Sequence, residues 1–99
     1  MHAFEMRRKA RAFVLVDTEP GKEEEVLKKL IELDEVKEGH IVPGEHDIIL
    51  ILEFERELIA PVEEKIMRFV TSKVATAEGV KDTHTIIPSY SLTKWIRSA

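Results

Sequence analysis

The stretch DIILILEFE, residues 47–55, constrains the fold of this chain most, because five apolar side chains follow one another without interruption from Ile48 to Leu52. Successive side chains of a β-strand point to opposite faces of the sheet, so a strand covered on one side alternates apolar and polar residues. A strand that is apolar on both sides needs a cover on both of its faces. The remainder of the fold has to supply these two covers.

Three further strands and two helices are predicted around this stretch. Residues 12–18 are β-branched and aromatic, and residues 36–42 and 81–88 form weaker, more polar strands. One helix follows the residues TEPGK and ends near Leu33, and the other begins near Pro61, each with acidic residues in its first turn. The apolar side chains at helical spacing are Val26, Leu27, Leu30, Ile31 and Leu33 in the first helix and Val62, Ile66, Phe69 and Val70 in the second.

The order of these elements, β-α-β-β-α-β, predicts a single ferredoxin-like α+β domain, with an antiparallel four-stranded sheet of order 4-1-3-2 and two helices on one face. The two most apolar strands, 12–18 and 47–55, then lie in the middle of the sheet, and the polar strands form its edges. We divide the chain into a basic N-terminal extension of residues 1–11, the domain of residues 12–88 and a C-terminal tail of residues 89–99.

Both helices cover the same face of such a sheet, so the opposite face is open in a single copy. By alternation, Phe13 and Leu15 of the first strand and Ile49 and Ile51 of the third point to this open face. Burying these four side chains is worth about 6 to 12 kcal/mol, at 1.5 to 3 kcal/mol each. We predict a homodimer in which two sheets pack face to face as a sandwich or barrel; the alternative is that the tail after Pro88 folds over the sheet.

The composition argues against several classes of protein. A net charge of −4 does not suit a domain that neutralises phosphate, and we expect Arg7, Arg8, Lys9 and Arg11 to be solvated in a frayed terminus rather than bound to nucleic acid. No stretch approaches the roughly 20 apolar residues needed to span a membrane. The absence of cysteine suits a reducing cytoplasm, and the absence of Asn and Gln suggests a heat-adapted source.

No motif in the sequence requires an enzyme. The chain has no nucleophile elbow, no phosphate-binding glycine loop and no cysteine, and we expect Glu53 and Glu55 to lie at the solvated end of a strand. Dimeric ferredoxin-like domains nevertheless include small oxygenases and isomerases, whose sites depend on few residues. A small enzyme of this kind is therefore the alternative function, by analogy of fold alone.

The histidines are candidates for a metal site because of their residue type. Imidazole and carboxylate suit zinc or non-haem iron, and His40, His46, His84 and Asp47 are candidates. The spacing does not support this interpretation, because no His-x-His or His-x3-His pair occurs. We predict solvated or hydrogen-bonded histidines, and neither a metal nor another cofactor.

Three stretches of the sequence resemble a known family. AFVLVDTEPGKEEEVLKKL, VKEGHIVPGEHDIILIL and EGVKDTHTIIP are similar to the effector-binding domain, or RAM domain, of the Lrp/AsnC transcriptional regulators, over residues 12–88. In that family a helix-turn-helix precedes this domain, whereas eleven residues precede it here, so we expect a stand-alone member without the DNA-binding half. The resemblance implies a homodimer that can extend to a larger ring.

The loop before residues 47–55 carries the most specific part of the resemblance. In the family a Gly-x-aromatic-Asp pattern in this loop contacts an amino-acid effector at a subunit interface, and this chain has Gly44, Glu45, His46 and Asp47 there. Gly44 permits close backbone approach, free N–H groups suit an α-carboxylate, and the Asp47 carboxylate suits an α-ammonium. The alternative from the residues alone is a hairpin turn, shaped by Pro43 and Gly44, in which Asp47 bonds to nearby backbone.

Two further segments complete the predicted site and interface. Thr83 and Thr85 match threonines common in the family and share a face, so their hydroxyls are secondary candidates for the ligand site. Leu92, Trp95 and Ile96 have the spacing of a short amphipathic turn, which we expect to dock on its own dimer or to stabilise a ring.

The predicted function is a cytoplasmic, non-enzymatic module that binds an amino acid or a similar small effector between subunits. Ligand binding would modulate oligomerisation or the choice of partner, including full-length Lrp/AsnC regulators, with no direct contact to nucleic acid or membrane.

Overall fold

The computed structural model describes residues 4–5 and 9–94. Its main sheet contains β2 (Lys9–Thr18), β3 (Val36–Ile41), β4 (Ile48–Glu55) and β5 (Val80–Ile86), all antiparallel, in the order β3-β4-β2-β5. The helices are α1 (Glu23–Leu30) and α2 (Val62–Phe69), and α2 continues as a π-helical segment, η1 (Val70–Val74). A separate two-stranded sheet pairs β1 (Phe4–Glu5) with β6 (Leu92–Thr93).

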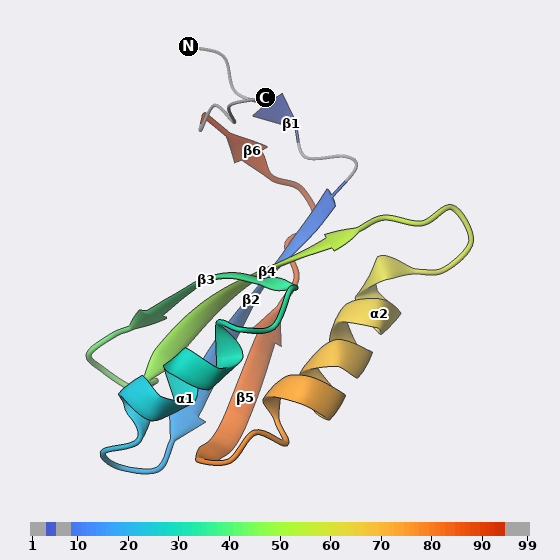
Figure 1. Cartoon of the computed structure of the whole chain (residues 1–99). Helices are drawn as coiled ribbons and strands as arrows, with labels where there is room; N and C mark the ends of the chain where they lie inside the picture. The colour runs from blue at the N-terminus through green and yellow to red at the C-terminus, as the bar shows by residue number, and fades with distance from the viewer. Residues whose placement is uncertain (1–3, 6–8, 95–99) are drawn as a thin grey trace.

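The predicted ferredoxin-like fold is confirmed, including the strand order and the placement of α1 and α2 on one side of the sheet (Figure 1). Among the described residues, no helix is both long and apolar enough to cross a membrane. The element boundaries differ slightly from the prediction, since α1 ends at Leu30 and β5 ends at Ile86. The division at residues 11 and 88 stays a prediction, although β2 begins before it, at Lys9.

The core lies between the helices and the inner face of the sheet. Val14, Val16, Leu50 and Leu52 are fully buried there, as alternation along β2 and β4 predicts. The buried apolar residues are Ala10, Ala12, Val14, Val16, Val26, Leu30, Val36, Ile48, Leu50, Leu52, Phe54, Val62, Ile66, Val70 and Val74. Ile31, which the helical pattern had placed in the apolar stripe, is 43% exposed and is the C-cap residue that directly follows α1.

The opposite face of the sheet has an apolar centre. In the register of the sheet Phe13 lies opposite Ile51, and Leu15 lies opposite Ile49, so these four side chains share one face, as predicted. Ile86, opposite Phe13 on β5, extends the same surface and is 51% exposed. All four predicted residues are only partly buried in the single chain. We refer to this surface as the open face.

The tail does not cover the open face within the described residues. β6 lies beyond the end of the main sheet, where it pairs with β1 (Figure 1). Leu92 is therefore in a strand and not in the predicted helical turn, while Trp95 and Ile96 lie outside the described residues.

The prediction of solvated charges near the N-terminus is wrong for Lys9 and Arg11. Both residues are in β2, and they lie 3.4 Å and 4.0 Å from the carboxylate of Glu53. Only 6% of the Glu53 side chain is exposed, so the predicted solvation is wrong for Glu53, whereas Glu55 is exposed as predicted. The reason is that β2 extends along β4 to Lys9, which places cations opposite the end of β4. Arg7 and Arg8 lie outside the described residues.

Replacement of a core leucine tests this packing. Leu50→Ala is expected to lower the free energy of unfolding by about 2 to 5 kcal/mol, because Leu50 is fully buried under the helices. Met67→Ala, on the exposed side of α2, is expected to change it by less than about 0.5 kcal/mol. Chemical denaturation followed by circular dichroism measures both, and similar losses in the two variants would contradict this assignment of faces.

Candidate functional site

The loop of residues 42–47 joins β3 to β4 at one end of the open face. It is closed by a hydrogen bond from the Val42 N–H to the Asp47 carbonyl, at 3.0 Å, and anchored by one from the Asp47 N–H to the Val16 carbonyl, at 3.1 Å. Gly44 has a φ of 121°, which L side chains rarely adopt, and a Cβ at this position would meet no atom within 4 Å. The backbone at Gly44 is therefore open to close approach by another molecule.

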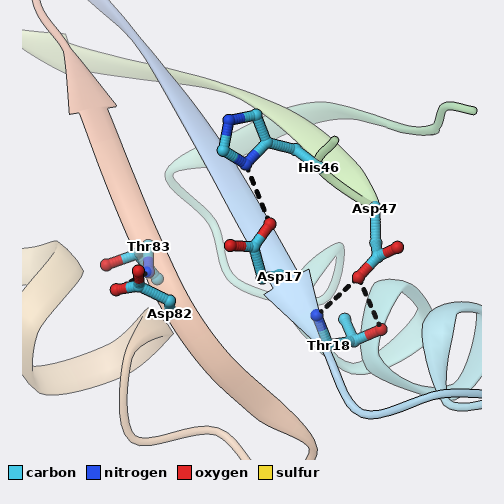
Figure 2. Close-up of polar contacts among 6 residues, drawn as sticks. All are labelled: Asp17, Thr18, His46, Asp47, Asp82 and Thr83. Carbon is cyan, nitrogen blue, oxygen red and sulfur yellow. Dashed lines mark hydrogen bonds and ion pairs between the residues drawn. The ribbon is translucent and has the colours of Figure 1, made fainter. Parts of the chain in front are cut away.

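Asp47 fastens this loop to the end of β2. Its Oδ2 accepts hydrogen bonds from the Thr18 N–H, at 2.8 Å, and from the Thr18 hydroxyl, at 3.4 Å (Figure 2). Thr18 is buried, so its N–H needs such an acceptor. Within the described residues Oδ1 of Asp47 has no hydrogen-bond partner. The structure thus shows the backbone-bonding role that the hairpin interpretation assigned to Asp47, except that the bonded backbone lies 29 positions away.

His46 turns from the same loop toward β2 and β5. Its Nδ1 lies 2.8 Å from Oδ1 of Asp17, and its ring meets the ring of His84 edge to face, with a centroid separation of 5.5 Å. Asp17 lies opposite Asp82, and His84 lies opposite Leu15, which places both on the open face. Figure 2 shows the His46 ring above Asp17, with its second nitrogen directed away from the carboxylate.

The surroundings of His46 favour its protonated form. The hydrogen bond to Asp17 is the main cause that raises the pKa of His46 above 6.5, and the negative charges of Asp17, Glu45 and Asp47 act in the same direction. Partial desolvation opposes these effects without reversing them. The loop therefore presents an ionisable side chain at this end of the open face.

The structure does not bring the two threonines together with His46. Thr83 lies opposite Val16 and Thr85 opposite Val14, so both share the helix-facing side of the sheet, away from the open face. They do share a face, as alternation predicted, but it is not the face of Asp17 and His84. Their role in ligand binding stays a prediction, as does that of the loop residues.

Asp17 and His84 were not identified from the sequence as candidates for the ligand site. Alternation along β2 could have identified Asp17, since it continues the outward series of Phe13 and Leu15. His84 was considered only for a metal, because nothing in its local sequence indicates that it meets His46. Within the described part of the chain, no three acidic or imidazole side chains are grouped to hold a metal ion, and His40 contacts Glu38 instead, at 3.1 Å.

The comparison with protein families identifies the same class of domain. The family model described as the Lrp/AsnC ligand binding domain matches residues 11–92. An uncharacterized HTH-type transcriptional regulator of Pyrococcus horikoshii, PH0140, is 37% identical over 84 residues, which are 85% of this chain and 49% of that protein. The chain spans about half the length of the curated relatives it matches.

Solved structures agree with this assignment. The crystal structure of the hypothetical protein PHS023 from Pyrococcus horikoshii has a TM-score of 0.65 and 34% identity, over 80% of this chain and 88% of that one. A transcriptional regulator of Neisseria meningitidis, NMB0573, solved as a complex with L-Met, has a TM-score of 0.59, over 90% of this chain and 53% of that one. At 19% identity, this second likeness concerns the fold alone.

Removal of the Asp17 charge tests the environment of His46. Asp17→Asn is expected to lower the pKa of His46, because the hydrogen bond to a carboxylate is the main cause of its elevation. The proton resonances of the imidazole, followed by NMR over pH 5 to 9, about the range where histidine titrates, measure this pKa directly. Glu38→Gln, which changes the partner of His40, is the matched control and should leave the His46 titration unchanged.

The contact between His46 and Asp17 is expected to make the stability of the fold depend on pH. A raised folded pKa means that the stabilisation is complete below pH 6.5 and is lost as the pH rises through the folded pKa. The stability difference between the original chain and Asp17→Asn should therefore shrink toward alkaline pH. A difference that grows with pH would exclude this role for the His46 and Asp17 pair.

Proposed function

The chain belongs to the Lrp/AsnC ligand-binding domain family, and we propose that it binds an amino acid or a similar small effector at an interface between two copies of itself. The family comprises ligand-binding regulatory domains of transcriptional regulators. The proposal depends above all on one observation: the open face is apolar at its centre, and the loop of residues 42–47 lies at its edge.

The apolar centre of the open face supports a homodimer. Phe13, Leu15, Ile49 and Ile51 form a contiguous surface, because they pair directly across β2 and β4. Each of the four is already partly buried in the single chain, so an interface would bury only the part that remains exposed. This gain is smaller than the roughly 1.5 to 3 kcal/mol of a fully exposed side chain, and it is set against the loss of rotational and translational freedom. A second copy related by a two-fold axis offers the same surface in return. We therefore place the interface between two open faces.

The loop at the rim of this interface suits a small zwitterion. Gly44 lets the backbone approach a ligand, and Oδ1 of Asp47 has no hydrogen-bond partner within the described residues, so it can accept from an α-ammonium. The carboxylate is already oriented by Thr18, which lowers the entropic cost of binding. The Neisseria meningitidis neighbour, solved with L-Met, shows that a protein of this fold holds an amino acid.

Ligand binding would act on the assembly. An effector that contacts both copies binds the closed interface more tightly than the separated chains, so it shifts the population toward the assembled state. The same interface would let the chain assemble with full-length Lrp/AsnC regulators or into a larger ring. The matched relatives are named as HTH-type transcriptional regulators, which favours this regulatory role over a small ferredoxin-like enzyme.

A charge on the open face tests the dimer. Ile49→Asp is expected to convert the dimer into a folded monomer at micromolar concentration, because two carboxylates would be desolvated across the two-fold axis. Ile41→Asp is the matched control, since Ile41 is 45% exposed and lies opposite Ile48 on the other side of the sheet. Light scattering after size exclusion gives the masses, and circular dichroism verifies folding. A monomeric original chain would refute the interface.

Melting curves with a panel of amino acids and related small acids test the ligand. At a concentration of 100 times Kd, a true effector should add about 2.7 kcal/mol of stability. Asp47→Asn retains an acceptor for Thr18 but removes the charge, so it should abolish the ligand-induced shift relative to its own unliganded curve. Glu45→Gln, in the exposed part of the loop, should retain more of the ligand-induced rise in melting temperature than Asp47→Asn does. If no compound of the panel raises the melting temperature, the effector hypothesis is wrong.

A further inference from the structure

The contact between His46 and His84 is the feature of the open face that the effector proposal does not use. Two imidazoles from the β3 to β4 loop and from β5 meet across the end of β2, with ring centroids 5.5 Å apart. We propose that His46 and His84 together bind a divalent transition-metal ion of the zinc class at this corner of the open face. This site does not depend on the proposed effector.

The required ring nitrogens are available. The Nδ1 of His46 faces Asp17 at 2.8 Å, which leaves Nε2 as the nitrogen that can bind a metal, and Nε2 points away from the carboxylate (Figure 2). Metal-binding histidines typically donate their other N–H to a carboxylate in this manner, which fixes the tautomer and the ring orientation. Within the described residues the His84 side chain has no hydrogen-bond or ion-pair partner, and His84 is exposed. Its ring can therefore turn toward a shared ion.

The separation of the two rings fits one shared ion. Zinc binds imidazole nitrogen at about 2.0 to 2.1 Å in a tetrahedral arrangement, which puts the centroids of two ligating rings roughly 5 to 6 Å apart. The observed 5.5 Å lies in this range. Binding would therefore need a rotation of the rings and little movement of the backbone.

The local charge favours a cation over an anion. The carboxylates of Asp17, Glu45 and Asp47 all act on His46, and Asp82 lies opposite Asp17 on β5. An anionic ligand would meet this negative field, whereas a divalent cation would be stabilised by it. Both imidazoles and their acidic surroundings thus select the same class of ligand.

The chain supplies two ligands in this arrangement, and water completes the coordination shell. No third acidic or imidazole side chain joins them within the described residues, so the site differs from the closed four-ligand sites that hold structural zinc. We accordingly expect the site to bind zinc with micromolar affinity and to exchange the bound ion rapidly with solution. A bound ion would connect the loop of residues 42–47 to the edge strand β5, and it would raise the stability of this corner.

Calorimetric titration with zinc chloride on untagged protein tests the site. The original chain should bind one ion per chain, and His46→Ala and His84→Ala should each weaken binding at least tenfold. His40→Ala is the matched control, because His40 is on the same face but contacts Glu38 and, among the residues that the structure describes, no second imidazole. Asp17→Asn, which removes the orienting carboxylate, should weaken binding by about 10 to 100-fold.

The outcomes separate the metal site from an isolated surface histidine. Loss of binding in both His46→Ala and His84→Ala, with His40→Ala unchanged, supports the shared site. An original chain that binds no zinc, or a titration that depends on one of the two histidines alone or equally on His40, overturns it. His46→Gln provides a second variant if His46→Ala unfolds, and circular dichroism verifies the fold. The effector melts are run with a chelator, so failure of either proposal leaves the other unaffected.

Discussion

The structure depends on the double-sided apolar character of the two central strands. On β2 and β4, the residues that face the helices and the residues that face away are both largely apolar, and two helices can cover only one side of a four-stranded sheet. The helices of the same chain cover the inner side, where Val14, Val16 and Leu50 are fully buried. The outer side is not covered in this way, since its central residues remain partly exposed. The proposed interface follows from this asymmetry and from the size of the hydrophobic effect.

The polar residues around the open face divide into two groups with different physical roles. At one end Lys9 and Arg11 surround the nearly buried carboxylate of Glu53, which keeps a charge paired beside the apolar centre. At the other end, Asp47 and His46 leave the same loop in different directions. Asp47 secures the end of β2 through Thr18, and His46 reaches Asp17 and the ring of His84. The loop is therefore anchored by hydrogen bonds while it presents ionisable groups at the edge of the open face.

His46 stands where the pattern expected from the resemblance has an aromatic residue, and its chemistry differs from that of an aromatic residue. An aromatic ring offers a ligand an apolar surface, whereas the imidazole beside Asp17 offers a proton-dependent charge and a nitrogen donor. Gly44 provides an open backbone position, and Asp47 provides a carboxylate held by Thr18, as expected for the effector loop. In the proposed effector site, this loop would keep the backbone opening and the carboxylate while the imidazole changes the selectivity.

Prediction from the sequence succeeded where one pattern repeats along an element. Alternation along residues 12–18 and 47–55 identified the central strands and their inward and outward residues, and helical spacing identified the buried side of α2. Prediction failed for side chains whose contacts depend on which strands are neighbours and on how many residues of two strands pair. Lys9 and Arg11 were expected to be solvated because their partner, Glu53, is distant in sequence. Thr83 and Thr85 were grouped correctly, but the register of β5 against β2 determined the face that they occupy.

By itself, the sequence determined the order of the elements, the composition of the core and the existence of an apolar surface without a cover. These properties follow from local periodicity, because hydrophobic burial acts on every residue of a face in the same way. The tertiary structure alone decided that Asp47 bonds to Thr18 and that His46 lies between Asp17 and His84. Hydrogen bonds and ring contacts need specific atoms within a few ångströms, and such proximity between distant residues arises only from the register of the folded sheet.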